Sequence, residues 1–396
     1  MNLADSEEMA GHLFLRGYTL TENLEEADLA LINTCTVRDH AEHRALSFLG
    51  RLRQWKREKS GRQIIFAGCA AQRLGQKLRK TFPFLDIVSG AREIDQFALL
   101  LDKHHFHTAT TAQEPTAKGI TGYVTIMRGC DFACSYCIVP TVRGPVHCLP
   151  ATEILKNATQ KAAQGYPEIM LLGQTVNAWR EDGKTFADLL NDVSALPGVE
   201  RVRFVSPHPA FITPQFLAGI KDNPKIARHI HLPAQSGSSK VLQEMKRGYS
   251  REIFLEKIAA LKELGFAIST DLIVGFPTET EADFQQTLSL VEQAGFSTAY
   301  CFKYSPRQGT PAAQMKLVDE KILEQRLDIL LNKVKGLAEH AYQQQVGHTV
   351  QVLMESQNKG RSSENFWVET KKSYTIGSII TSEVVSTEDT LLITRN

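Results

Sequence analysis

Three cysteines follow an apolar run in the spacing C-x3-C-x2-C, within the sequence Gly129-Cys130-Asp131-Phe132-Ala133-Cys134-Ser135-Tyr136-Cys137. Structural zinc uses four ligands, often in C-x2-C pairs, and no fourth candidate lies nearby. Three thiolates match instead an iron–sulfur cluster with one iron left open for a substrate or cofactor. The spacing i, i+4, i+7 also suits one face of a core helix, which is the alternative.

The chain after this stretch alternates strand-like and helical patterns. Six apolar runs predict strands at 123–127, 169–172, 202–205, 229–232, 267–274 and 298–302. Helical periodicity predicts helices at 152–164, 186–195, 239–264, 281–294 and 319–345. Parallel neighbours need long crossover connections, so this alternation predicts a parallel sheet, closed or partly closed as a (β/α)6 barrel.

Polar residues follow four of the predicted strands directly, in the segments 173–177, 206–209, 235–238 and 275–278. Barrels of parallel strands build their sites at the carboxyl ends of the strands. We therefore expect a binding site there, although polar residues also begin ordinary loops. The candidate binding residues are Gly173, Gln174, Asn177, Ser206, Gln235 and Ser236.

The first hundred residues predict a smaller α/β unit. Helices are expected at 5–18, 38–59 and 93–101, and strands at 29–33 and 63–67. Cys35 and Cys69 each follow one of these strands. Equivalent positions on neighbouring strands can converge on one metal, so we expect a second metal centre here. The alternative is that both are core residues.

The remaining segments complete a three-domain organisation. The polar stretch 103–121 predicts a linker, and short β-type runs at 349–354, 366–370, 378–385 and 391–394 predict a small β-barrel. The expected boundaries are 1–102 for the N-terminal domain, 122–338 for the parallel barrel and 339–396 for the tail.

Composition narrows the class of protein. Hydrophobic residues make up 42% and charged residues 22% of the 396 residues, which excludes a disordered or collagen-like chain. No apolar run is long enough to span a membrane and no leader-like segment opens the chain, so we expect a cytoplasmic protein. Its seven cysteines are then ligands, catalytic groups or buried thiols rather than disulfides.

The net charge of +1 hides a basic segment at 38–62. It is either a solvated helix face or a phosphate-binding patch. The candidate RNA contacts there are Arg51, Arg53, Lys56 and Arg57.

With these motifs in hand, the chain resembles the radical S-adenosylmethionine methylthiotransferase family over nearly its full length. The resemblance implies a 4Fe-4S cluster on Cys130, Cys134 and Cys137 that binds S-adenosylmethionine, with Tyr136 near that cofactor. It implies a flavodoxin-like N-terminal domain, here lacking its first strand, in which Cys35 and Cys69 hold an auxiliary 4Fe-4S cluster. The tail is similar to an RNA-binding TRAM barrel, with Arg361 as a candidate RNA contact.

Within that family the segments 127–131, 137–140, 206–209 and 231–233 match best the enzymes that act on isopentenyladenosine in tRNA. The resemblance then implies methylthiolation of C2 of that base beside the anticodon, with an electron donor such as a flavodoxin or ferredoxin and a monomeric enzyme. The alternative targets are threonylcarbamoyladenosine in tRNA and a ribosomal-protein aspartate. A reading from another class is a non-catalytic RNA-binding protein with structural zinc.

Two departures from the family pattern stand out. The family has a cysteine on a strand two residues before a Met-Asn pair, and this chain begins at that pair, Met1-Asn2. We expect a start assigned at an internal methionine, since a cluster held by two cysteines would be labile. The chain also has Cys148-Leu149 before Pro150, where the family has Ser-Arg.

Overall fold

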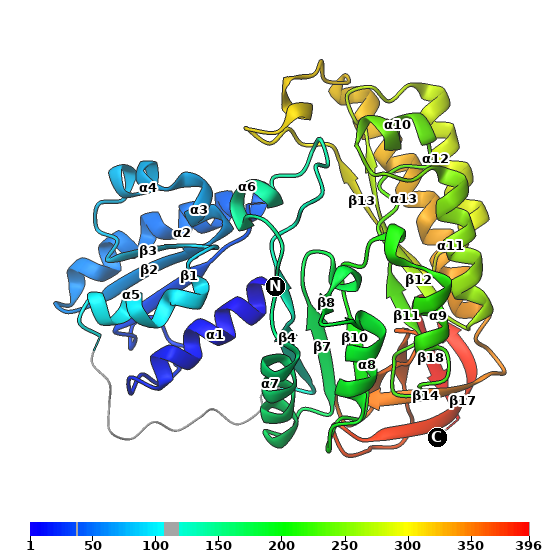
Figure 1. Ribbon diagram of the computed structural model, residues 1–396, viewed down its shortest axis with the longest axis horizontal. Helices are drawn as coiled ribbons and strands as arrows, with labels where there is room; N and C mark the ends of the chain where they lie inside the picture. The colour runs from blue at the N-terminus through cyan, green and yellow to red at the C-terminus, as the bar shows by residue number, and fades with distance from the viewer. Residues whose placement is uncertain (37–38, 107–118, 396) are drawn as a thin grey trace. The chain divides into compact units, whose positions relative to one another are not determined.

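The computed structural model describes residues 1–36, 39–106 and 119–395 (Figure 1). The chain divides into two compact units, and the cysteine stretch is shared between them. The first unit comprises Met1–Thr116, Arg128–Asp131 and Cys137–Val146. The second comprises Ala117–Met127, Phe132–Tyr136 and His147–Asn396. Each unit is described by itself below.

The first unit is built on a parallel sheet of three strands in the order β1-β2-β3. The predicted strands are confirmed as β1 (Leu29–Asn33) and β2 (Gln63–Gly68), and β3 (Ile87–Gly90) was not predicted. The other helices are α1 (Asn2–Phe14), α2 (Asp39–Glu58), α3 (Cys69–Leu74), α4 (Gln76–Thr81), α5 (Phe97–Lys103) and α6 (Val139–Arg143). The predicted helix 93–101 is a short 3-10 turn (Ile94–Gln96) followed by α5.

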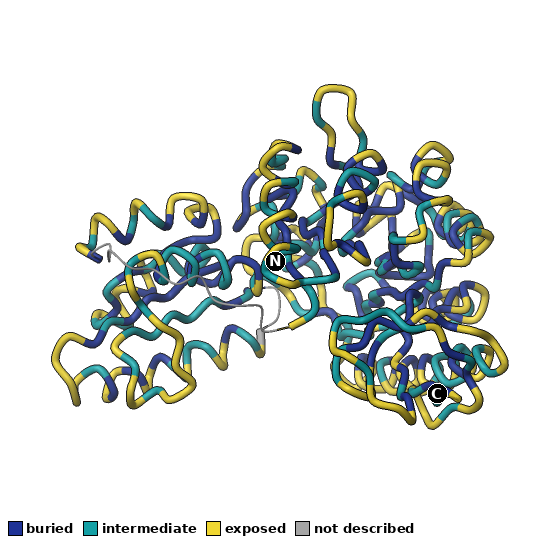
Figure 2. The backbone as a smooth tube through the Cα atoms, turned by 90° about the horizontal axis from the view of Figure 1, so that it is seen from below, coloured by how far each residue is buried: buried dark blue, intermediate teal, exposed yellow. Residues whose placement is uncertain are grey.

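Alternation along β2 builds a core on each face of this sheet. Ile64 and Phe66 pack against α2, α3 and α4, whereas Ile65 and Ala67 pack against α1 and α5. Successive strand residues point to opposite faces, so an unbroken apolar strand is covered by helices on both sides. Strand β2 is the most buried of the three, whereas every residue of β1 is only half-buried; Figure 2 colours buried backbone dark blue and half-buried backbone teal. Most of the predicted linker, residues 107–118, lies outside the described residues.

The second unit contains the six predicted parallel strands as two sheets of three. One sheet has the order β10-β7-β4 and the other β11-β12-β13. A single parallel bridge from Val202 to Ile226 runs from β10 to the segment that leads into β11. The strands are β4 (Thr121–Thr125), β7 (Glu168–Leu172), β10 (Arg201–Phe204), β11 (His229–His231), β12 (Ala267–Val274) and β13 (Thr298–Lys303).

Helices connect these strands, as the periodicity predicts. They are α7 (Ala151–Ala163), α8 (Phe186–Ser194), α9 (Pro214–Ile220), α10 (Ser239–Glu244), α11 (Arg251–Glu263), α12 (Glu281–Ala294) and α13 (Glu320–Gln343). Short pieces are β5 (Met127–Arg128), β6 (His147–Cys148), β8 (Arg180–Glu181) and β9 (Lys184–Thr185).

The prediction of one helix over 239–264 is wrong, because two helices lie there. Lys246 has a φ of 57° and Gly248 a φ of 75°, which no right-handed helix accommodates. The carbonyls of Glu244 and Met245 are taken by the hydroxyl and backbone N–H of Ser135 instead of continuing the helix. Gly248 and Ser250, whose hydroxyl caps the second helix by accepting from the N–H of Ile253, are the local sequence signals of this break.

The tail folds into a closed five-strand barrel in the order β14-β15-β16-β18-β17. Its strands are β14 (Thr349–Met354), β15 (Lys359–Ser362), β16 (Trp367–Glu369), β17 (Ile379–Glu388) and β18 (Leu391–Thr394). Of these, β15 was not predicted. Arg201 and Arg203 of β10 donate to the carbonyl of Ser362, so strand β10 is hydrogen-bonded to the tail barrel.

Candidate active site

The cysteine stretch is a loop between β5 and α6. Cys134 is buried, with 8% of its surface exposed, and its sulfur accepts a hydrogen bond from Arg247 Nη1 at 3.4 Å. The Cys137 sulfur accepts one from the backbone N–H of Val139, also at 3.4 Å. The backbone N–H of Cys130 donates to the carbonyl of Gly144. The helix-face alternative is therefore wrong, because α6 begins only at Val139.

Arg247 is the side chain that supports Cys134. It donates through Nε to the hydroxyl of Tyr249, and that hydroxyl lies 3.1 Å from the carbonyl oxygens of Pro233 and Ala234. Burial alone disfavours the guanidinium, but Tyr136, Tyr249 and Cys134 outweigh it and raise the pKa of Arg247. A permanent positive charge thus lies against the Cys134 sulfur.

No group of three or more His, Cys, Asp or Glu side chains in the described part of the chain is arranged to hold a metal ion. The chemistry of the donors nevertheless fits an iron–sulfur cluster, because hydrogen bonds to sulfur and a nearby positive charge both favour the thiolate. The sulfurs of Cys134 and Cys137 receive such contacts, so the residues of this loop fit an iron–sulfur cluster.

Two of the predicted binding residues, Asn177 and Ser236, hold loops in place. The Asn177 amide bonds both the N–H and the C=O of His208, joining the segments that follow β7 and β10. The Ser236 hydroxyl contacts Thr287 and accepts from the N–H of Ser238. Both side chains are almost fully buried, so their polar groups are used within the protein.

The other predicted residues lie at the same strand ends. Ser206 and Gln235 have φ values of 60° and 71°, which are unusual for residues with a side chain. Gly173 packs so closely on Met127 that a Cβ would lie 2.4 Å from its Cγ. Tyr136 packs against a core that includes Met245.

Four buried polar atoms at these strand ends have no hydrogen-bond partner among the described residues. They follow β7, β10, β12 and β13, and they are Gln174 Oε1, His208 Nε2, Thr278 Oγ1 and Tyr304 Oη. An unpaired buried polar atom costs about 1–3 kcal/mol, so such atoms usually have a partner that the protein alone does not supply. Their position supports a polar ligand at this end of the strands.

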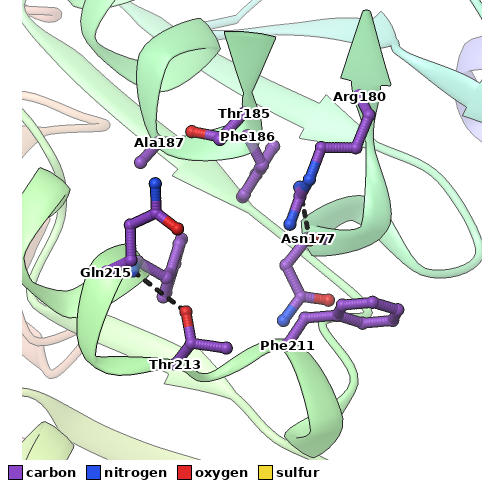
Figure 3. Close-up of a pocket in the computed structure, with 9 residues that line it drawn as sticks. Asn177, Arg180, Thr185, Phe186, Ala187, Phe211, Thr213 and Gln215 are labelled. Carbon is purple, nitrogen blue, oxygen red and sulfur yellow. Dashed lines mark hydrogen bonds between the residues drawn. The ribbon is translucent and has the colours of Figure 1, made fainter. Parts of the chain in front are cut away.

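A small hollow of about 20 Å³ lies beside Asn177, between α8 and α9 (Figure 3). Arg180 donates to the carbonyl of Asn177 there, and Phe211 and Phe216 line the apolar part. That volume holds about one water molecule, so the hollow itself is too small for a nucleoside.

In the first unit, the strand register brings the other two predicted cysteines together. Asn33 pairs with Ala67 at the end of the parallel β1–β2 ladder, and Cys35 and Cys69 follow these two strand ends, close enough for the charge of one to act on the other. Burial is the main cause of the raised pKa of the Cys69 thiol, and the neighbouring Cys35 raises it further. A Cβ on Gly68 would lie 2.1 Å from Asn33 Oδ1, so the close approach of the ends of β1 and β2 needs glycine at this position.

A buried ion network lies next to this pair. Asp5 has no exposed surface and bridges Arg128 and Arg143, at 2.6 Å and 2.7 Å. Arg143 also hydrogen-bonds the Cys69 sulfur. Asn33 donates to the hydroxyl of Ser6, which ties the segment before Cys35 to helix α1.

The predicted RNA contacts differ in how free they are. Arg51, Arg53 and Arg57 are exposed on α2, whereas Lys56 pairs with Asp86 and holds the carbonyl of Phe84. Arg361 lies 4.0 Å over the ring of Trp367 and pairs with Glu355. Arg38 lies outside the described residues.

Sequence reasoning missed Arg247 and Tyr249 as site residues, and it quoted His208 only as part of a motif. The ring of His208 stacks on Phe132 of the cysteine loop, with 4.0 Å between ring centres. Burial, with a smaller effect of Arg247, lowers the pKa of His208 to about 3. The signal available in the sequence was the position of His208 after β10.

Comparison with known proteins gives the class first. The model of the radical SAM superfamily matches residues 124–291, and the model described as uncharacterized protein family UPF0004 matches residues 1–90. The structure of the radical S-adenosylmethionine methyltransferase TsrM from Kitasatospora setae, with tryptophan and a SAM analog bound, is similar with a TM-score of 0.57. It is 14% identical, over 77% of this chain and 66% of that chain, which supports the fold alone. Fold and cysteine loop together define a radical SAM enzyme.

Curated relatives give the particular family. Proteins named tRNA-2-methylthio-N(6)-dimethylallyladenosine synthase are similar over most of their length. One from Caldicellulosiruptor saccharolyticus is 41% identical, over 94% of this chain and 85% of its own. One from Koribacter versatilis is 38% identical, over 92% of this chain and 88% of its own. The chain belongs to this family of radical SAM tRNA methylthiotransferases.

No described helix combines the length and the apolar character that crossing a membrane requires.

Proposed function

We propose that this protein methylthiolates C2 of N6-isopentenyladenosine next to the anticodon of tRNA. The C2–H bond is replaced by a C2–S bond. One S-adenosylmethionine gives the methyl group, and a second gives the 5′-deoxyadenosyl radical that takes the hydrogen. C2 of adenine carries no acidic proton, so a base alone could not activate it. The observation that carries the proposal is the C-x3-C-x2-C loop with hydrogen-bond donors on the Cys134 and Cys137 sulfurs.

Cys130, Cys134 and Cys137 would hold the 4Fe-4S cluster that supplies the electron for cleaving S-adenosylmethionine. The role of this chain's own residues is to position the cluster ligands and the bound molecules and to exclude water. Arg247 fixes Cys134, while Asn177 and Ser236 fix the loops around the strand ends. Gln174, Ser206 and Gln235 would then face the cofactor. The electron would come from a flavodoxin or ferredoxin.

Cys35 and Cys69 would supply two ligands of an auxiliary 4Fe-4S cluster through which sulfur is delivered. Arg143 supports this role, because it hydrogen-bonds Cys69 and is itself locked by Asp5. Its charge favours the Cys69 thiolate against the effect of burial.

Exposed arginines would contact the tRNA backbone. Arg51, Arg53 and Arg57 are exposed on one helix, and neutralised phosphates supply most sequence-independent affinity for nucleic acid. Arg361 stacked on Trp367 offers a flat surface on the tail barrel of the kind that single-stranded bases stack on. A tRNA substrate implies work in the cytoplasm.

Mass spectrometry of tRNA nucleosides tests the function. The gene is expressed in a bacterial strain that makes isopentenyladenosine but cannot methylthiolate it, with the Cys134→Ala variant as matched control. The wild-type protein, expressed from its natural start, should convert isopentenyladenosine to its 2-methylthio form, and the variant should not. Methylthiolated threonylcarbamoyladenosine or ribosomal-protein aspartate, with unchanged isopentenyladenosine, would replace the proposed target.

A further inference from the structure

The tautomer of His208 is fixed by its surroundings. Its Nδ1 accepts a hydrogen bond from the backbone N–H of Ala210 at 3.2 Å, so Nδ1 carries no proton. The ring is neutral at pH 7, because its pKa is lowered to about 3, chiefly by burial. A neutral imidazole has one N–H, and here it is on Nε2.

That N–H donor is buried and has no acceptor among the described residues. His208 is 5% exposed, and its Nε2 is one of the unpaired atoms at the strand ends. The ring is held by the Ala210 N–H on its Nδ1 and by its stack on Phe132, so it cannot turn towards water without losing both contacts. The donor is therefore preorganised for an acceptor that the protein does not provide.

Two independent contacts place this donor beside the cysteine loop. The ring is stacked on Phe132, which lies between Cys130 and Cys134 in the sequence, at an angle of 19° between the planes. Another neighbour is Tyr249, with 5.6 Å between ring centres, and Tyr249 holds the Arg247 that contacts the Cys134 sulfur. The ring that carries the donor therefore lies against the cysteine loop through Phe132.

We propose that His208 Nε2–H donates a hydrogen bond to a ring nitrogen of an adenine bound at the ends of strands β7 and β10. This inference rests on the proposed function, in which both S-adenosylmethionine and the target nucleoside carry an adenine. Adenine fits because its ring nitrogens are neutral acceptors, which match a neutral donor in a desolvated place better than a charged group does. His208 is then a binding residue that orients the base.

The test compares two variants with the wild-type protein. His208→Phe keeps an aromatic ring against Phe132 and removes the N–H, whereas His208→Gln restores an N–H at a similar distance from the backbone. His340→Phe, an exposed histidine on α13, is the matched control. Iron content and circular dichroism report whether each variant folds and carries its cluster.

Two affinities are measured on reconstituted protein: that for S-adenosylmethionine, and that for an anticodon stem-loop with isopentenyladenosine. His208→Phe should weaken one of them about tenfold to a hundredfold, His208→Gln should recover much of the loss, and His340→Phe should change neither. The affected affinity identifies the source of the adenine.

Deaza analogues then locate the acceptor. The 1-deaza, 3-deaza and 7-deaza forms of the affected adenine each remove one ring nitrogen. One of them should bind the wild-type protein weakly, and His208→Phe should not distinguish it from the parent compound. If His208→Phe changes neither affinity, or if all analogues behave alike in both proteins, the inference is wrong. A wild-type protein that binds both ligands but leaves isopentenyladenosine unmodified would overturn the proposed function alone.

Discussion

The two cysteine regions are built in different ways. Cys35 and Cys69 are brought together by the backbone register of two adjacent strands, with the Asp5 network locking the arginine beside them. Cys134 lies in a loop, and its sulfur is held by a side chain 113 positions further along the chain, Arg247. The strands that precede Cys35 and Cys69 can be predicted from local sequence, whereas so distant a support cannot.

The largest expected effect separates the roles of the two regions. Cys134→Ala should abolish 5′-deoxyadenosine formation, because the loop loses a cluster ligand. Cys69→Ala should leave that reaction in place and abolish methylthiolation, because only sulfur delivery is affected. Both products are measured by liquid chromatography with mass spectrometry. Loss of 5′-deoxyadenosine in Cys69→Ala as well would remove the distinction between the regions.

The ion network predicts a large local loss of stability in the first unit. Asp5→Asn leaves Arg128 and Arg143 buried without their shared carboxylate, and breaking a buried ion pair costs about 3–5 kcal/mol. Hydrogen exchange of peptides from β1, β2 and β3 measures the local free energy of opening. Asp28→Asn, which removes an exposed pair with Lys59, is the control and should change nothing measurable. Equal protection in both variants would contradict this reading.

Arg247 should tune the loop cluster. Arg247→Gln removes a positive charge and a donor from the Cys134 sulfur, so the reduced cluster loses stabilisation and its midpoint potential should fall. Contacts of this kind typically change activity about 10- to 100-fold. Arg247→Lys should recover part of the shift in a redox titration followed by electron paramagnetic resonance. Arg143→Gln, the corresponding change beside Cys69, should leave the potential of the loop cluster unchanged, and an equal shift there would argue against a local effect.

The smallest expected effect is on the stability of the fold at acidic pH. His208 and His229, whose pKa values are both lowered to about 3, lie in the second unit. His229 contacts Ser269, and burial is the main cause of its shift, followed by Arg203, His231 and Arg361. A histidine with a lowered pKa stabilises the fold above pH 6.5, and this contribution is lost as the pH falls from 6.5 towards 3.

Urea unfolding at several pH values measures this loss. One such histidine lowers the free energy of unfolding by up to about 2 kcal/mol as the pH falls from 6.5 to 4.5. His229→Asn should flatten the pH dependence by that amount, with His340→Asn as the exposed control. An unchanged slope in His229→Asn would mean that this histidine is not buried neutral in the folded protein.

Much of the fold could be predicted, because periodicity and strand-end residues report local structure. The strands 29–33, 267–274 and 349–354 are confirmed at their predicted limits, as is helix 281–294. The break after Glu244 was missed although Gly248 and the capping Ser250 mark it locally, and only the contact of Ser135 with the Glu244 carbonyl is out of reach of the local sequence. The domain boundaries at 102, 122 and 338 stay predictions.

The sequence predicted where the residues of the candidate site lie better than it predicted what each of them does. Gln174 lies at a strand end with an unpaired oxygen, as a ligand contact would, whereas Asn177 and Ser236 use their polar groups to hold loops. His208 was passed over because a lone histidine in a motif gives no sign of its tautomer. Only the contacts of Nδ1 and the lack of one at Nε2 disclose it.

Iron and sulfide per chain after anaerobic reconstitution test the central claim most directly, which is that the cysteine loop and the Cys35–Cys69 pair are separate cluster sites. The wild-type protein, expressed from its natural start, is compared with a variant in which Cys130, Cys134 and Cys137 are all alanine. The account predicts about eight irons in the first and about four in the second. Equal iron content in the two proteins would contradict it.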